Sequence, residues 1–304
     1  MLDIIGVGDV NIDIMISVDH PPYHDEKVRG KEIGKFPGGI IGNFCSAAAG
    51  FGAATGALCK IGKDEYGRLS IEDLQKRGID TSRMVIGEDS STYYCIVQLD
   101  DTGEKALTIV ETDAIVPKKE EIDIEYLKTA KRVHMNTLDV ELVAYVAKSL
   151  DGSDVKLSLD IEPTCKDLRP ELWDAILPRL DVALPNKAGL EHITGKASME
   201  EGAKALLEKG VKTVVVTCGD DGVYITDGKT TVRQGIFKVD VKDTTGAGDC
   251  FNAVFLGCLV RGYSYAKAAK YASAAAAISI RSFGARSSLP SEKEIEDFIK
   301  SYDN

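Results

Sequence analysis

The sequence predicts an α/β protein with a mostly parallel central sheet, helices on both faces of that sheet, and a small separate β-sheet beside it. Three observations predict this architecture. Short β-branched runs alternate with helical patterns from end to end, which is typical of β–α–β units. The 304 residues are 44% apolar and 28% charged, enough to bury one large core without disulfides or a metal. Two strand-like stretches, at about 12–35 and 91–112, interrupt the alternation.

The main elements follow from the hydrophobic period of each segment. Continuous apolar runs predict buried strands at 4–7, 133–135, 157–160, 182–184 and 214–217. Helical patterns cover 65–77, 140–149, 188–194, 200–209, 253–260 and 292–302. In such a sheet, ligands are expected at the carboxyl ends of the strands. We expect residues 1–304 to form one domain.

The two interrupting stretches predict a sheet of their own. The first begins with alternating residues and then carries Pro21 and Pro22, and the second predicts two strands around a turn at 100–104. Such a sheet would be a lid over the cleft or a dimer surface, and two edge hairpins of the main sheet are the alternative. Because a small sheet with exposed edges is marginal by itself, we expect a homodimer formed through it.

Charge and cysteine content exclude several classes of protein. Lys and Arg total 37 against 48 Asp and Glu, a net charge of −11, so we expect neither a nucleic-acid nor a membrane partner. The seven cysteines have no CxxC or Cys/His ligand spacing, which favours buried thiols in a reducing compartment over a zinc site. The first residues carry no Lys or Arg and lead into a strand. We therefore expect no signal peptide and a cytoplasmic protein.

The most informative segment is the run DTTGAGDCFN at 243–252, just before the predicted helix at 253–260. Glycines at a helix start let backbone amides point outward, and these amides and the helix dipole form a site for negative charge. Asp249 beside that site suggests a base for phosphoryl transfer, and the alternative is a first-turn residue that only stabilises its helix. A helix amino terminus lowers the pKa of an Asp, so we expect Asp249 to act late in the reaction.

Other phosphate-binding motifs do not fit the sequence. The pattern GxxxxGK[ST] is absent, and so are the HRD and DFG elements of protein kinases. Gly6 and Gly8 follow a strand, but no third glycine arrives at the spacing of a dinucleotide-binding fingerprint. These three classes of nucleotide site are therefore not expected.

Two separated motifs resemble those of the ribokinase-like (PfkB) carbohydrate kinases, in the same order and over nearly the whole chain. The later one is DTTGAGDCFNA, and the earlier one runs from Pro37-Gly38-Gly39 through Asn43 and is followed by Gly50-Phe51-Gly52 and by IGKDEYG at 61–67. The resemblance implies a ribokinase-like fold. It also implies an ATP-dependent kinase that phosphorylates a hydroxymethyl group of a small sugar or sugar acid with Mg²⁺.

The resemblance further implies roles for individual residues. Asp249 would be the base, and the anion hole would consist of the amides of Gly246, Ala247, Gly248 and Asp249. Sugar hydroxyls would contact Asn11, Asp13, Gly39 and Asn43. The nucleotide would contact Asn186, Thr217, Gly219, Gly222 and Ser273. A monovalent cation, K⁺, would be held by side chains or carbonyls of Asp243, Thr245, Ser279, Ser282, Gly284 and Ser288.

The sequence departs from the family pattern in places that bear on metal and substrate. Gly189 stands where the family has the Glu of its Asn-x-x-Glu motif, and that Glu helps to organise magnesium. Ser273 stands where ribokinases commonly have Asn. Residues 38–43, GGIIGN, lack the Lys of ribokinases, so ribose is not assigned as the substrate. Three cations in the segment expected to form the lid could meet an acidic group on a substrate, namely Lys27, Arg29 and Lys35.

Two other functions remain open from the sequence. A nucleoside kinase of the same fold would need an aromatic side chain beside the base, for which Tyr93 and Tyr94 are candidates. The Gly189 departure also leaves open a catalytically degenerate sensor that binds sugar or nucleotide without transfer. Retention of Asp249 favours the enzyme.

Overall fold

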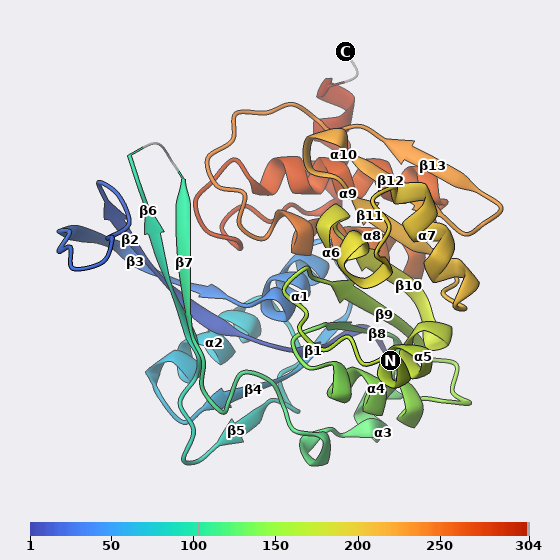
Figure 1. Cartoon of the computed structure of the whole chain (residues 1–304), viewed down its shortest axis with the longest axis horizontal. Helices are drawn as coiled ribbons and strands as arrows, with labels where there is room; N and C mark the ends of the chain where they lie inside the picture. Colours follow the sequence, from blue (N-terminus) through green and yellow to red (C-terminus); the bar gives the residue numbers. More distant parts are fainter. Residues whose placement is uncertain (102–103, 303–304) are drawn as a thin grey trace.

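The computed structural model describes residues 1–101 and 104–302, and its main sheet is mostly parallel, as the sequence predicts (Figure 1). Within the described residues this sheet has nine strands in the order β13-β12-β11-β10-β9-β8-β1-β4-β5. The parallel strands are β1 (Leu2–Gly8), β4 (Thr55–Gly62), β5 (Val85–Gly87), β8 (Ala130–Asn136), β9 (Lys156–Ile161), β10 (Leu180–Pro185) and β11 (Val214–Thr217). An antiparallel edge, which the sequence analysis did not anticipate, is formed by β12 (Val223–Thr226) and β13 (Thr231–Gln234).

Helices cover both faces of the main sheet. Successive strand residues point to opposite sides, so that Val214 and Val216 pack in one core and Val215 in the other. The core with Val215 includes residues of α1 (Ile40–Gly50), α2 (Glu65–Lys76), α8 (Ala247–Val260), α9 (Tyr265–Ser279) and α10 (Glu292–Tyr302). The opposite core includes residues of α3 (Ile124–Leu127), α4 (Val140–Ser149), α5 (Pro170–Ile176), α6 (Lys187–Thr194) and α7 (Met199–Glu208). No helix in the described ranges is long and apolar enough to cross a bilayer.

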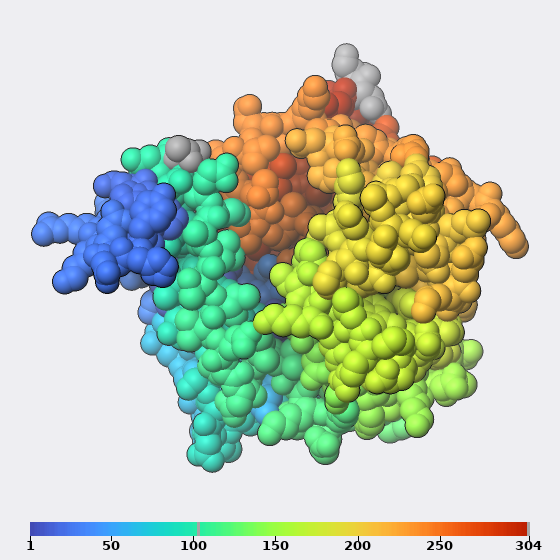
Figure 2. All heavy atoms as spheres, viewed as in Figure 1, coloured from blue at the N-terminus to red at the C-terminus, as the bar shows by residue number. Residues whose placement is uncertain are grey.

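The two interrupting stretches form a separate four-stranded sheet, here called the small sheet, and not edge hairpins of the main one. Its order is β3-β2-β6-β7, and the strands are β2 (Asn11–Val18), β3 (Gly30–Gly38), β6 (Tyr94–Leu99) and β7 (Lys105–Val110). The two central strands pair parallel and the outer pairs are antiparallel. Residues 102 and 103 of the predicted turn lie outside the described residues. Figure 2 shows the surface hollowed between β6–β7 and the carboxyl-terminal half.

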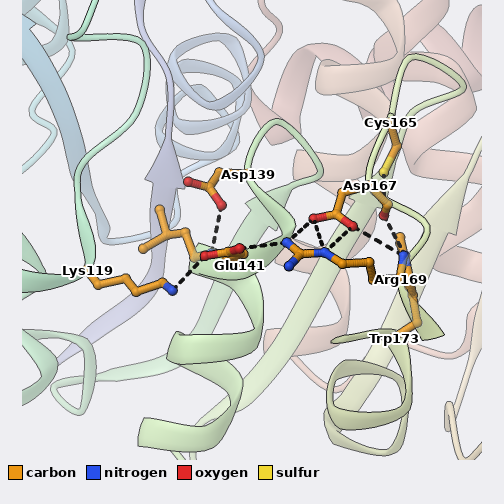
Figure 3. Close-up of polar contacts among 8 residues, drawn as sticks. Lys119, Asp139, Glu141, Cys165, Asp167, Arg169 and Trp173 are labelled. Atoms are coloured by element: carbon orange, nitrogen blue, oxygen red, sulfur yellow. Dashed lines mark hydrogen bonds and ion pairs between the residues drawn. The ribbon is translucent and has the colours of Figure 1, made fainter. Parts of the chain in front are cut away.

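A network of polar contacts anchors the loop that leads from β9 to α5 (Figure 3). Arg169 donates to the carboxylates of Asp167 and of Glu141 on α4 (2.6 Å each), and Lys119 also donates to Glu141 (2.9 Å). The indole of Trp173 donates to the carbonyl of Asp167 (2.9 Å). The charged groups are largely exposed, so each ion pair stabilises the fold little. Together they hold in place the loop that follows the carboxyl end of β9.

Candidate active site

The amino terminus of α8 lies at the carboxyl edge of the main sheet and presents a glycine-rich turn. The helix begins at Ala247, six residues earlier than the predicted 253, so Asp249 lies within its first turn. Gly246 caps the helix with φ 76°, and a Cβ there would lie 2.6 Å from that of Ala285. Only glycine suits this position. The first amides of a helix have no intrahelical acceptor, but the Ala247 amide already donates to the carbonyl of Thr244 (3.2 Å).

Asp249 is held by a side chain from α1, which packs against α8 in the same core. Asn43, on α1, donates its amide to Oδ2 of Asp249 at 2.9 Å. Burial raises the pKa of Asp249 to about 7, and the negative charges of Asp9 and Glu162 add to this increase, while Asn43 and Arg286 oppose it. The dipole of α8 by itself would lower the pKa of Asp249. The expectation of a lowered pKa is therefore wrong, because burial and neighbouring carboxylates outweigh the helix dipole.

A pKa of about 7 for Asp249 predicts how activity varies with pH. A base must be deprotonated, so kcat/KM should rise about tenfold per pH unit below pH 7 and level off above about pH 8. A pH–rate profile at constant ionic strength measures this. A rate that is flat between pH 5.5 and 8 would contradict the assignment of Asp249 as a base whose pKa is about 7.

Among the residues that the resemblance assigns to a sugar, Asn43 contacts Asp249, and two others contact each other. The side chain of Asn11 donates to Oδ1 of Asp13 (3.0 Å) and to the sulfur of Cys95 (3.1 Å). Burial raises the pKa of Asp13. The Oδ1 of Asn11 is buried and accepts no hydrogen bond within the protein, so a hydroxyl donor would satisfy it. The backbone amide of Asn43 donates to the carbonyl of Gly39 (2.8 Å). This hydrogen bond places Asn43 in the first turn of α1.

Asp9 joins this pocket to three separate elements, and sequence reasoning missed it. Its carboxylate accepts the amides of Ile40 (3.0 Å) and Ile41 (3.3 Å) at the start of α1, so it caps that helix from outside. It also accepts the hydroxyl of Tyr93 (2.5 Å) and the amide of Asn136 on β8 (2.6 Å). An acidic residue at the end of the first strand was the available signal, but nothing local shows which donors it meets.

Arg286 is a second residue that the sequence analysis missed. It is only 5% exposed, and its guanidinium donates to Oδ1 of Asn43 (2.9 Å), to Asp73 on α2 (2.8 Å) and to the carbonyl of Gly38. Arg286 thereby orients the side chain of Asn43, whose amide contacts Asp249. A lone Arg between Gly284-Ala285 and Ser287-Ser288 carries no recognisable motif.

The two tyrosines proposed for base stacking are both engaged elsewhere. Tyr93 is 5% exposed, and its hydroxyl is bound to Asp9. Tyr94 packs edge-on against Tyr66 of α2, with ring centroids 5.7 Å apart. Lys35 lies over the same Tyr66 ring, and its register pairs it with Ile14, whose side chain points to the sheet face opposite Asp13. Tyr94 and Lys35 therefore lie on the face of the small sheet away from Asp13. Tyr93 borders the pocket through Asp9, but its ring is too buried to stack on a base.

A cavity of about 560 Å³ adjoins the start of α8, and Asn43 is not among the residues that line it. Four residues predicted for the nucleotide line it, namely Thr217, Gly219, Gly222 and Ser273. Apolar side chains that the sequence analysis did not single out line the rest, including Phe237, Val239 and Phe251. Gly248 also lines this cavity, so the helix start is shared between the cavity and the sugar pocket.

Asn186, the fifth residue predicted for the nucleotide, is not among the residues that line the cavity. Its Oδ1 accepts the amide of Gly189 (2.7 Å) and caps α6. A Cβ at position 189 would collide with the carbonyl oxygen of Ile161. The glycine that departs from the family pattern is therefore explained by close packing, and a Glu at this site would require the backbone to move.

Among the residues predicted for a monovalent cation, Thr245 and Gly284 contact Asp243. Its carboxylate accepts the backbone amides of Thr245 and Gly284 (2.9 Å each). Ser288 donates to Ser282 (2.7 Å), and the hydroxyl of Ser279 donates to the carbonyl of Ala276 (2.9 Å). No group of three or more His, Cys, Asp or Glu side chains in the described ranges could hold a metal ion.

This cleft, with a carboxylate between an apolar cavity and a polar pocket, is that of a group-transfer enzyme. The family model described as "pfkB family carbohydrate kinase" matches residues 1–292. The ribokinase of Haemophilus influenzae is 29% identical over 306 residues, with 97% of each chain covered. Among solved structures, a ribokinase from Thermotoga maritima superposes with TM-score 0.89 at 31% identity, covering 99% of this chain and 100% of that one. An Arabidopsis thaliana ribokinase complexed with ribose and ATP gives 0.86 at 25% identity, covering 98% and 99%.

The chain therefore belongs to the pfkB family of carbohydrate kinases. It is a kinase, a phosphotransferase with an alcohol group as acceptor, and its fold is ribokinase-like, as the sequence predicts.

Proposed function

We propose that the protein transfers the γ-phosphoryl group of ATP to a hydroxymethyl group of a small sugar or sugar acid. The observation that carries the proposal is the shared position of the α8 amino terminus. Gly248 lines the 560 Å³ cavity, and the next residue, Asp249, is hydrogen-bonded to Asn43 of the polar pocket. A phosphate in the cavity and a hydroxyl in the pocket would meet at this turn.

The chemistry that these residues support is an in-line displacement. The substrate oxygen forms a bond to the γ-phosphorus, the bond from that phosphorus to the bridging oxygen breaks, and ADP leaves. The hydroxyl proton passes to the carboxylate of Asp249. The outward amides of the turn stabilise charge on the transferred group, and the conformation at Gly246 orients them. Because the Ala247 amide has a partner, the amides of Gly246, Gly248 and Asp249 are the principal candidates for the anion hole.

Magnesium would enter with ATP and neutralise part of the phosphate charge. The protein offers no Glu at position 189, and Asn186 is used as a helix cap. We therefore assign magnesium to the nucleotide phosphates and propose no residue of the α6 turn as its ligand.

The substrate test is a panel of sugars, sugar acids and nucleosides, with ADP release as the readout. We expect turnover of one or more sugars or sugar acids. The positions of Tyr93 and Tyr94 support a sugar over a nucleoside, because neither ring is placed to stack on a base. Turnover of nucleosides alone would overturn the sugar assignment. Tight binding of ligands without any transfer would favour the sensor.

We further propose a homodimer formed through the small sheet, in the cytoplasm. Both edge strands, β3 and β7, lack a neighbour on one side within the described chain, and Ile33 on β3 is 43% exposed. All seven cysteines are free thiols, which supports a reducing compartment. Light scattering should give twice the monomer mass, and Ile33→Lys should lower it. A wild-type protein that stays monomeric at all concentrations contradicts the dimer.

A further inference from the structure

One cation of the small sheet reaches across to the loop that precedes α8. Lys105, the first residue of β7, donates its ammonium to Oδ1 of Asp243 at 2.8 Å and to the hydroxyl of Thr245 at 2.5 Å. These partners are 138 and 140 positions later in the chain. The contact joins the small sheet to the turn that carries the proposed anion hole.

We propose that the ammonium of Lys105 is a built-in cation for the 243–245 loop, and that it couples the position of the small sheet to that of the α8 amino terminus. This inference rests on the proposed kinase function, and it adds a positioning residue that no motif of the sequence indicated.

Asp243 needs a positive partner because it is a nearly buried charge. Its side chain is 3% exposed, and that of Lys105 is 21% exposed. Its carboxylate accepts hydrogen bonds from Lys105, Thr245 and Gly284. Without an ammonium, its negative charge would face only uncharged backbone and hydroxyl donors.

The contacts of Asp243 lead directly to the turn at Gly246. One carboxylate oxygen accepts the amide and hydroxyl of Thr245 (2.9 and 2.6 Å), and the other accepts the amide of Gly284 (2.9 Å). The residue after Gly284, Ala285, packs against Gly246 so closely that a side chain there would clash. Asp243 thus clamps both segments that enclose Gly246. A change in its charge balance would move the amides of the turn.

The ammonium reaches this carboxylate only while β7 lies against the loop. Within the described residues, backbone hydrogen bonds join β7 only to β6, where Lys105 is the register partner of Leu99. A cavity of about 200 Å³ lies at this junction, lined on the small-sheet side by Met15 and Leu99 and on the other side by Val241 and Phe283. This cavity separates the small sheet from the loop beside the ion pair. Movement away from the loop would withdraw the charge from Asp243.

The same contact bears on the predicted potassium ion. Within the residues predicted for it, Asp243 is the only charged side chain, and its charge is already balanced by Lys105. A second cation beside the ammonium would place two positive charges around one carboxylate, which is unfavourable. The described geometry therefore does not fit an additional monovalent cation while Lys105 is in place.

The test compares Lys105→Met with wild type, in potassium chloride and in choline chloride at equal ionic strength. Wild-type kcat should agree within about twofold between the two salts, because the ammonium is built in. In choline, Lys105→Met should lose roughly 100-fold in kcat, the scale of a small misplacement of catalytic groups. Potassium should restore part of it. Lys242→Met removes a neighbouring exposed charge as the matched control and should behave as wild type.

A thermal-unfolding arm keeps this inference separate from the kinase assignment. Lys105→Met should lower Tm by roughly 5 °C in choline, and potassium should recover part of the loss, whatever the protein phosphorylates. Two results would overturn the inference. One is a wild-type rate that is many-fold higher in potassium than in choline, or a wild-type Tm that is clearly higher in potassium. The other is a Lys105→Met protein equal to Lys242→Met in both salts.

Discussion

Asp249→Asn is expected to lower kcat roughly 1000-fold while leaving the affinity for ATP or ADP within about threefold of wild type. The substitution keeps the size of the side chain and can still accept the hydrogen bond from Asn43. It removes only the capacity to take up the hydroxyl proton. Initial rates with the best substrate of the panel, and calorimetric titration with ADP, measure the two quantities. The exposed Asp297→Asn on α10 is the control.

The same variant should be more stable than wild type at pH 8, and the sign follows from the pKa. The folded-state pKa of Asp249 is about 7, against an ordinary value of 3.8. The folded protein therefore holds a proton that the unfolded chain releases between those values, so stability falls as pH rises through this window. Asparagine at position 249 does not titrate, so the variant does not lose this stability as the pH rises. An Asp249→Asn protein that keeps wild-type kcat, or that is less stable than wild type at pH 8, would contradict the role assigned to this carboxyl.

Arg286→Met is expected to have the largest effect on stability, about 3 kcal/mol, because it leaves a carboxylate and a carbonyl without their buried donor. The partners that lose it are Asp73, Asn43 and the carbonyl of Gly38. The expected fall in Tm is roughly 6 °C. kcat should also fall, since Asn43 loses the contact that orients it toward Asp249.

Arg77→Met is the matched control for this prediction. Arg77 contacts the same carboxylate of Asp73 (3.2 Å), but its side chain is 29% exposed, so its loss should cost about 1 kcal/mol or less. Thermal unfolding of both variants, together with their kcat values, separates the two roles. Equal losses of stability and kcat for Arg77→Met and Arg286→Met would contradict the role assigned to the buried guanidinium of Arg286.

Local patterns in the sequence predicted the elements and one end of the site. The buried strands at 133–135 and 157–160 lie within β8 and β9, and the last helix has the bounds predicted for it. Strand and helix periods are local properties, which is why they can be read from a single chain. The motif from Asp243 to Asn252 was recognisable for the same reason, since a glycine-rich turn and the helix it opens are contiguous.

The relation between distant parts of the site was not predictable in this way. Asn43 meets Asp249 across 206 positions, Arg286 meets Asn43 across 243, and Lys105 meets Asp243 across 138. One sequence carries no signal that pairs such residues. The pKa of Asp249 illustrates the consequence, because the helix start argues for a lowered value and the burial supplied by other segments raises it.

The chain alone thus determined an α/β fold, because hydrophobic period is a local property. Two motifs that resemble those of the pfkB family implied a kinase with an Asp at the start of a late helix. Only the tertiary structure decided what surrounds this Asp. Burial, the neighbouring carboxylates, and the charges of Arg286 and Lys105 depend on how segments from both ends of the chain pack together.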